Sequence, residues 1–302
     1  WTPVTLGEGS TPVIWAQKAG HAIGCKLEYL NPTASYKDRG SAILVNHMVL
    51  RGIARCVEDS SGNAGASLAA YAAKSGIAAE IYVPTDASGP KKDQMSYYGA
   101  KLIEVSGPRS EAAKAVLRAL KDDIVYASHA YLPFGQLGIA TIAYELWLEL
   151  GDIGTIVAPV GHGGLLNGII IGYEALIQAG MQTRVPYMIG VQAQGCAPAA
   201  AMYYGGKAAM NQITIEPTIA EGVRVVDPVW AEAIVQWMDL NRGHFVTIDE
   251  ARILPARNEL AKFGVCVEPT SALVWAALDE LIEKVPEPIV VILTGSGLKY
   301  PE

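Results

Sequence analysis

Short apolar segments alternate with longer Ala- and Leu-rich segments along almost the whole chain, and this alternation restricts the possible folds most. The short segments have the length of buried strands, and the expected strands are 56–59, 79–83, 101–105, 124–127, 155–160, 187–192 and 289–293. The longer segments predict helices over 40–50, 64–74, 111–121, 137–150, 165–178, 230–240, 251–263 and 271–284. Strands that alternate with helices predict an α/β fold of parallel sheets with helices on both faces.

The composition agrees with an α/β enzyme and argues against two other classes of protein. Of the 302 residues, 51% are hydrophobic and 18% are charged, which suits buried parallel strands. The formal net charge is −7 and the basic residues are scattered, so we expect no nucleic-acid partner. The longest apolar runs are too short to span a bilayer, so we expect no membrane partner.

The four cysteines are far apart and none forms a Cys-x-x-Cys pair. This spacing argues against a metal site and predicts reduced thiols in the core or in loops of a cytoplasmic protein. A catalytic thiol stays open as an alternative. The residues in question are Cys25, Cys56, Cys196 and Cys266.

The segment 31–40 places a single lysine, Lys37, between a turn-forming Asn-Pro and the expected start of a helix. Its sequence is Asn-Pro-Thr-Ala-Ser-Tyr-Lys-Asp-Arg-Gly, so the lysine has small and hydroxyl-bearing neighbours. An amine in such a turn can form a Schiff base with a carbonyl compound. The alternative is an ordinary surface lysine at a helix start.

Two further segments have the pattern of anion-binding loops. The first, 60–65, reads Ser-Ser-Gly-Asn-Ala-Gly and opens an Ala-rich helix, where hydroxyl and backbone N–H groups can bind an anion; an ordinary N-cap is the alternative. The second, 161–165, reads Gly-His-Gly-Gly-Leu between an expected strand and an expected helix. It is neither a Rossmann fingerprint, since Leu166 replaces the third glycine, nor a P-loop, since no Gly-Lys-Ser/Thr follows.

The segment around Lys37 resembles the active-site lysine motif of the fold-type II pyridoxal phosphate (PLP) enzymes, the tryptophan synthase β-like superfamily. It is most similar to that of threonine synthases, Asn-Pro-Thr-Gly-Ser-Phe-Lys-Asp-Arg-Gly, from which it differs at Ala34 and Tyr36. The two anion-binding loops resemble family loops in the same order. So do Glu-Pro-Thr-Ser-Ala at 268–272 and Leu-Thr-Gly-Ser-Gly-Leu-Lys at 293–299.

The resemblance implies a PLP cofactor, bound through Lys37 as a Schiff base, and a small amino-acid substrate. Lys37 is then also the acid and base of the reaction. The loop 60–65 would bind the substrate carboxylate, through Ser60, Ser61 and Ala64. The other cofactor-binding residues implied are Asn63 beside the ring, Thr294 at the ring nitrogen, and Gly161, His162, Gly163, Gly164 and Leu165 around the phosphate. A solvent-facing His162 stays open as an alternative.

The resemblance also implies two lobes with the cofactor in the cleft between them, and a homodimer. The smaller, mobile lobe is expected at 40–145, and it carries the carboxylate-binding loop. Residues 1–39 and 146–302 form the larger lobe, which binds the cofactor phosphate.

The chain departs from threonine synthases where these bind the phosphate of O-phosphohomoserine. The segment 128–141 lacks the arginine of the family's Asn-Pro-Tyr-Arg motif, and Leu165 replaces an asparagine. Arg109, Lys91 and Lys92 are candidates to replace these contacts. We therefore expect a PLP-dependent lyase or synthase that eliminates or replaces a β or γ substituent, threonine synthase-like with a remodelled pocket. The alternatives are a serine/threonine dehydratase, a β-replacement synthase, a non-catalytic PLP-binding protein and a nucleotide-binding α/β protein.

Overall fold

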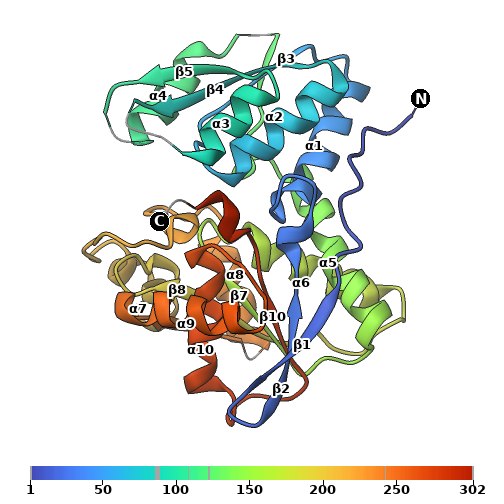
Figure 1. Cartoon of the computed structure of the whole chain (residues 1–302), viewed down its shortest axis with the longest axis vertical. Helices are drawn as coiled ribbons and strands as arrows, with labels where there is room; N and C mark the ends of the chain where they lie inside the picture. Colours follow the sequence, from blue (N-terminus) through green and yellow to red (C-terminus); the bar gives the residue numbers. More distant parts are fainter. Residues whose placement is uncertain (1, 86–88, 108, 122, 242, 301–302) are drawn as a thin grey trace. The chain divides into compact units, whose positions relative to one another are not determined.

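The structure is a computed structural model that describes residues 2–85, 89–107, 109–121, 123–241 and 243–300 (Figure 1). The chain forms two compact units, each with one β-sheet. Unit 1 comprises Trp1–Gly9, Leu30–Gly138 and Lys299–Glu302, and unit 2 comprises Ser10–Tyr29 and Ile139–Leu298. Two compact units do not show which segments move, so the mobile lobe expected at 40–145 stays a prediction.

Unit 1 is built on a parallel sheet of four strands in the order β5-β4-β3-β6. Side chains on the two faces of the sheet pack against different helices. Ile81 and Val83 contact α2 and α3 on one face, while Val57 and Tyr82 contact α4 on the other. Helices therefore cover both faces of the sheet. The elements are β3 (Arg55–Glu58), β4 (Ala78–Pro84), β5 (Lys101–Val105), β6 (Ile124–Tyr126), α1 (Lys37–Leu50), α2 (Asn63–Ser75), α3 (Pro90–Tyr97) and α4 (Arg109–Ala119).

Unit 2 is built on a six-stranded sheet in the order β1-β2-β10-β7-β8-β9, in which only the β1–β2 pair is antiparallel. Its strands are β1 (Val13–Lys18), β2 (His21–Lys26), β7 (Thr155–Pro159), β8 (Tyr187–Ala193), β9 (His244–Ile248) and β10 (Ile289–Ile292). Its helices are α5 (Phe134–Leu150), which begins in unit 1, α6 (Gly164–Gln178), α7 (Pro198–Met210), α8 (Ala231–Asn241), α9 (Glu250–Lys262) and α10 (Pro269–Leu281), with 3-10 turns at Glu28–Leu30, Glu221–Val223 and Gly297–Lys299.

The alternation of strands and helices confirms the predicted α/β fold with parallel sheets, with two kinds of correction. Strand β1 runs antiparallel to β2, because Ala19 and Gly20 both adopt positive φ and close a two-residue hairpin. Strands β1, β2 and β9 and helices α3 and α7 were not predicted. The seven predicted strands correspond to β3 to β8 and β10, and the eight predicted helices to α1, α2, α4 to α6 and α8 to α10.

All four cysteines are free thiols, three of them buried and Cys266 exposed. Burial raises the pKa of Cys25 to about 12, and burial followed by the charge of Glu58 does the same for Cys56. These two thiols therefore stay protonated at neutral pH, which argues against a thiolate nucleophile at either position. Within the described residues, no helix is long and apolar enough to cross a membrane.

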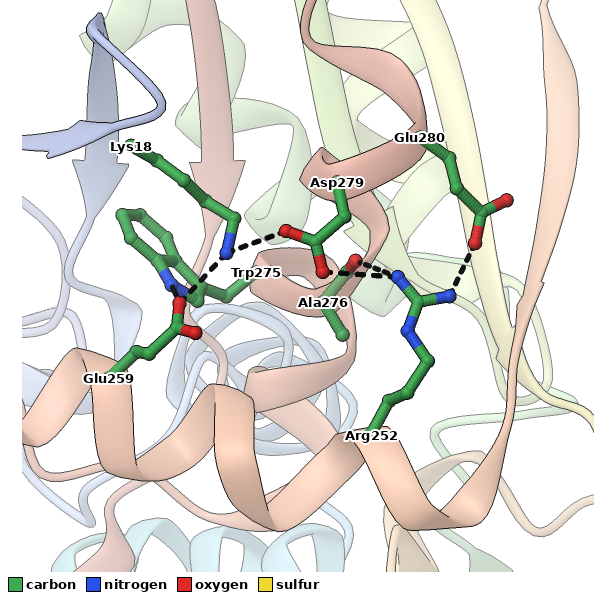
Figure 2. A network of polar contacts seen from close by, with 7 residues as sticks. All are labelled: Lys18, Arg252, Glu259, Trp275, Ala276, Asp279 and Glu280. Atoms are coloured by element: carbon green, nitrogen blue, oxygen red, sulfur yellow. Dashed lines mark hydrogen bonds and ion pairs between the residues drawn. The ribbon is translucent and has the colours of Figure 1, made fainter.

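A polar network connects the edge strand β1 to α9 and α10 in unit 2 (Figure 2). Lys18 Nζ lies 2.8 Å from Glu259 Oε2 and 2.9 Å from Asp279 Oδ1, and 5.2 Å from the ring centroid of the buried Trp275. Arg252 bonds both Asp279 and Glu280. The hydrogen bond to Lys18 is the main cause that lowers the pKa of Glu259. Burial raises the pKa of Asp279, but its bonds to Lys18 and Arg252 lower it overall.

Replacing Lys18 with methionine is expected to lower the free energy of unfolding by about 1 kcal/mol at neutral pH. The change removes two ion pairs with half-exposed partners and the cation–π contact with Trp275, and it keeps an apolar side chain of similar length. The lowered pKa values of Glu259 and Asp279 mean that this contribution is present above the unfolded values of 4.5 and 3.8 and is lost as the pH falls below them. Urea denaturation at neutral and at acidic pH measures it, with Lys262→Met on the exposed side of α9 as the control. An equal difference at both pH values would contradict the assignment.

Candidate active site

Lys37 is the first residue of α1, and the turn before it is fixed by the buried Asp38. Asp38 accepts hydrogen bonds from the backbone N–H of Thr33 at 2.6 Å and from the Thr33 hydroxyl at 2.5 Å. Ala34 within this turn has φ +63°, a left-handed conformation that glycine adopts more easily. An alanine in this conformation costs about 1 kcal/mol relative to glycine. The Lys37 amine lies 4.6 Å from the ring centroid of Tyr36.

Asp38 also connects the lysine turn to α2, the helix that the loop 60–65 opens. Ser67 of α2 places its hydroxyl 2.6 Å from Asp38 Oδ1, and Lys299 Nζ donates to the Thr33 carbonyl at 2.6 Å. Burial raises the pKa of Asp38, while the bonds from Ser67 and Thr33 and the charge of Lys299 oppose that change. The carboxylate therefore has three hydrogen-bond donors in a buried position, which holds the turn and α2 together.

The loop 60–64 lies at the N-terminus of α2, as predicted from the sequence. Ser60 and Ala64 are buried, whereas Ser61 and Asn63 are half-buried. The N-cap is Gly62, which has no side chain to cap the first N–H groups of α2. These groups are suited to a carboxylate. Unit 1 thus contains both Lys37 and the predicted carboxylate-binding loop, whose helices are joined by the hydrogen bond between Asp38 and Ser67.

Sequence reasoning did not identify the half-buried imidazole of His129 in this unit. His129 Nε2 lies 2.9 Å from the hydroxyl of Ser41, one helical turn after Lys37, and Ser41 Oγ lies 2.6 Å from Ser67 Oγ. Burial lowers the pKa of His129 to about 3, and the positive charge of Lys37 adds to this effect. His129 is therefore neutral at physiological pH. The only signal in the sequence was a histidine within the segment 128–141.

In unit 2, the glycine-rich loop follows β7 and opens α6. Gly163 is the N-cap with φ +92°, and a Cβ built on Gly161 would lie 2.6 Å from the Gly222 carbonyl oxygen, so neither position accepts a side chain. The Leu165 side chain is buried in the core, which leaves only its backbone N–H for an anion. His162 is half-buried, and its carbonyl accepts from Trp230 N at 3.0 Å.

Thr294, after β10, is buried against the start of α10. Ser271 Oγ lies 3.0 Å from the Thr294 hydroxyl and accepts from the backbone N–H groups of Thr294 and Gly295 at 2.9 and 3.1 Å. The neighbouring Thr270 accepts from Gly222 N at 3.0 Å, and Gly222 adjoins the glycine loop. The segment 268–272, interpreted above only as a family marker, therefore links Thr294 to the glycine loop.

The donor set of the two units matches the chemistry of pyridoxal phosphate. Unit 1 supplies a lysine amine and an anion-binding helix start, both tied to Asp38 and Ser67. Unit 2 supplies a loop at a second helix start that has glycine at 161, 163 and 164, which suits a phosphate. It also supplies a neutral hydroxyl pair, Ser271 and Thr294, which suits a ring nitrogen without forcing its protonation.

Comparison with known proteins agrees with this chemistry. Residues 4–295 match the family described as pyridoxal-phosphate dependent enzyme. The chain is 33% identical to the threonine synthase of Mycobacterium leprae, in an alignment that covers 100% of this chain and 85% of that protein. It is also 33% identical to the threonine synthase of Methanocaldococcus jannaschii, over 99% of this chain and 77% of that protein. A fungal L-serine ammonia-lyase from Rhizomucor miehei has the same fold, with a TM-score of 0.83 at 22% identity over 95% of this chain and 94% of that chain.

Proposed function

Because the chain belongs to the family of pyridoxal-phosphate-dependent enzymes, we propose that it is a lyase or synthase that eliminates or replaces an oxygen-linked β or γ substituent of a small L-amino acid. The chemistry is threonine synthase-like, with a remodelled substrate pocket. The observation that supports it best is the lysine turn, where Asp38 fixes Lys37 beside the helix that carries the carboxylate-binding loop. Pyridoxal phosphate supplies the electron sink for charge that develops at the substrate α-carbon.

Each predicted site residue has a role in this proposal. Lys37 would hold the cofactor through its aldehyde, and it would hold and move a proton at Nζ. Ser60, Ser61 and the N–H of Ala64 would bind the substrate carboxylate, and Thr294, held by Ser271, would be the partner of the ring nitrogen. The cofactor is further held by Asn63 and by the loop of Gly161, His162, Gly163, Gly164 and Leu165.

The segment 128–138 favours an uncharged substrate side chain. The segment contains no lysine or arginine, and its one histidine is His129. Because the pKa of His129 is lowered to about 3, the segment carries no positive charge at neutral pH. A phosphate dianion normally needs such a charge or several N–H donors. Of the candidate replacements, Lys92 is paired with Glu104 at 2.8 Å, and the Arg109 side chain lies outside the described residues. This supports a serine/threonine dehydratase or a β-replacement synthase as the second candidate.

The proposal is tested by the visible absorption spectrum of the PLP-loaded protein on separate addition of serine, threonine, O-acetylserine and O-phosphohomoserine. We expect a spectral change with at least one of the three amino acids with uncharged side chains, at a concentration about tenfold or more below that needed for O-phosphohomoserine. Product analysis then separates elimination, which yields a keto acid and ammonia, from replacement.

The other outcomes have definite meanings. A strong response to O-phosphohomoserine would overturn the inference from the neutral segment 128–138. A PLP spectrum that ignores all four compounds would favour a non-catalytic PLP-binding protein. Failure to bind PLP would favour a nucleotide-binding protein and remove the proposed chemistry.

Three further parts of the proposal rest on the resemblance described above. They are a mobile lobe at 40–145 against the larger lobe of 1–39 and 146–302, with one cofactor held by residues of both; a homodimer; and a cytoplasmic location.

A further inference from the structure

His129 lies over the face of α1 that carries Lys37. Residues three and four positions apart share one face of a helix, so Gly40 and Ser41 are on the side of Lys37. The His129 ring occupies that side: its Nε2 contacts the Ser41 hydroxyl, and a Cβ built on Gly40 would lie 3.6 Å from its Cδ2, in ordinary van der Waals contact. The imidazole therefore packs on the helix face that carries the lysine.

A chain of hydroxyl groups determines which nitrogen of His129 carries the proton. One oxygen of Asp38 accepts from the backbone N–H of Thr33, and the other accepts from the hydroxyl groups of Thr33 and Ser67. All three contacts can be hydrogen bonds when Asp38 is ionised, because an ionised carboxylate only accepts. The Ser67 hydroxyl has one hydrogen and lies 2.6 Å from two acceptors, Asp38 Oδ1 and Ser41 Oγ. An ionised carboxylate cannot donate, so with Asp38 ionised Ser67 donates to Asp38, and the hydrogen in the contact between the two serines comes from Ser41.

The assignment of hydrogens along the chain of hydroxyl groups extends to the imidazole of His129. The Ser41 proton is used toward Ser67, so His129 Nε2 must donate in its 2.9 Å contact with Ser41 Oγ. A neutral imidazole with a proton on Nε2 has a bare lone pair on Nδ1. Nδ1 is buried, and no group in the described part of the chain forms a hydrogen bond with it. A buried acceptor without a donor is costly, so such a group usually has a functional partner.

We propose that His129 is a positioning residue for Lys37: the chain from Asp38 through Ser67 and Ser41 holds the imidazole as the Nε2–H tautomer, and Nδ1 accepts a hydrogen bond from the Lys37 amine. The positive charge of Lys37 acts on His129 in the structure, in agreement with this neighbourhood. The bond keeps an N–H of Lys37 directed while the lysine moves protons at Nζ. This inference rests on the proposed role of Lys37.

The tautomer is measured directly by ¹⁵N NMR of the histidine-labelled, PLP-loaded protein, with the His129 signals assigned by their loss in His129→Gln. We expect a neutral ring with the proton on Nε2, unchanged between about pH 5.5 and 8.5. In Ser41→Ala, the Nε2 donor loses its acceptor and the other tautomer should appear. A proton on Nδ1, or a ring that titrates in this range, would overturn the inference.

Two variants separate the role of Nδ1 from that of Nε2. Asparagine places an amide oxygen near the Nδ1 position, whereas glutamine places an amide nitrogen near the Nε2 position and so keeps the Ser41 contact. We expect His129→Gln to lower kcat about tenfold with KM changed less than threefold, and His129→Asn to keep kcat within about threefold of the original. Equal losses, or a larger loss in His129→Asn, would show that His129 acts only through Ser41 as a structural group.

The NMR measurement and the activity measurements test the role of His129 and the proposed function separately. The NMR measurement needs no substrate, so an inactive protein with the Nε2–H tautomer would sink the proposed reaction and leave the hydroxyl chain established. An active enzyme with a proton on Nδ1 would do the reverse. Thermal unfolding of both His129 variants, compared with Ser41→Ala, shows whether a kinetic loss arises from damage to unit 1.

Discussion

Replacing Lys37 with alanine is expected to lower kcat by about 10³-fold or more while the protein stays folded. The lysine has two roles in the proposed reaction, since it binds the cofactor and moves the proton at the substrate α-carbon, and general acid–base catalysis alone contributes about 10²- to 10⁴-fold. Its contribution to stability is small, because it is half-buried and the contact of its amine with the Tyr36 ring contributes about 0.5–1 kcal/mol. Steady-state rates at saturating substrate measure the first effect and urea denaturation the second.

Lys74→Ala is the matched control for this variant, because Lys74 is an exposed lysine at the end of α2 in the same unit. It should change neither rate nor stability beyond about 0.5 kcal/mol. Retention of turnover in Lys37→Ala would show that another group moves the proton. A loss of rate that tracks a loss of folded protein would instead assign Lys37 a structural role.

The parallel α/β core could be predicted because its strands are short apolar runs between longer Ala- and Leu-rich segments. The elements that were not predicted lack this contrast. Helix α3 reads Pro-Lys-Lys-Asp-Gln-Met-Ser-Tyr and buries only Met95, so it has no apolar period to detect. Helix α7 contains Gly206 in a non-helical conformation with φ +74°, which interrupts the pattern. The turn between β1 and β2 uses Ala19 at φ +50°, a residue that rarely signals a hairpin.

The residues of the candidate site also fall into a group that could be predicted from the sequence and a group that could not. Lys37, the 60–64 loop and the glycine loop were predicted because each is a contiguous motif with its own local chemistry. The groups that hold them were not, because they come from distant parts of the sequence. Ser41 and His129 are 88 residues apart, and Asp38 and Ser67 are 29 residues apart. No periodicity or spacing encodes such pairs, which exist only because α1 packs against α2 and the 128–130 segment.

Replacing Gly65 with alanine is expected to lower the free energy of unfolding by about 1–3 kcal/mol and to raise KM for the amino-acid substrate. Helix propensity predicts the opposite, since alanine is favoured over glycine in a helix by about 0.8–1 kcal/mol. Steric contact decides between the two: a Cβ at Gly65 would collide with the Ser60 carbonyl oxygen and lie 2.9 Å from Met95 Cε, and backbone cannot move aside as a flexible side chain can. Urea denaturation and substrate titration measure the two effects.

The direction of the KM change follows from which loop must yield. Met95 is fully buried, so the Ser60 end of the carboxylate-binding loop has to shift, which displaces the hydroxyl groups proposed to bind the substrate. Gly62→Ala is the matched control in the same loop, since a Cβ there would meet only Ser60 Oγ at 3.8 Å, and its stability loss should stay below about 1 kcal/mol. A Gly65→Ala protein that is more stable than the original, or one that is destabilised with an unchanged KM, would mean that the loop tolerates the extra carbon or that its position does not control substrate binding.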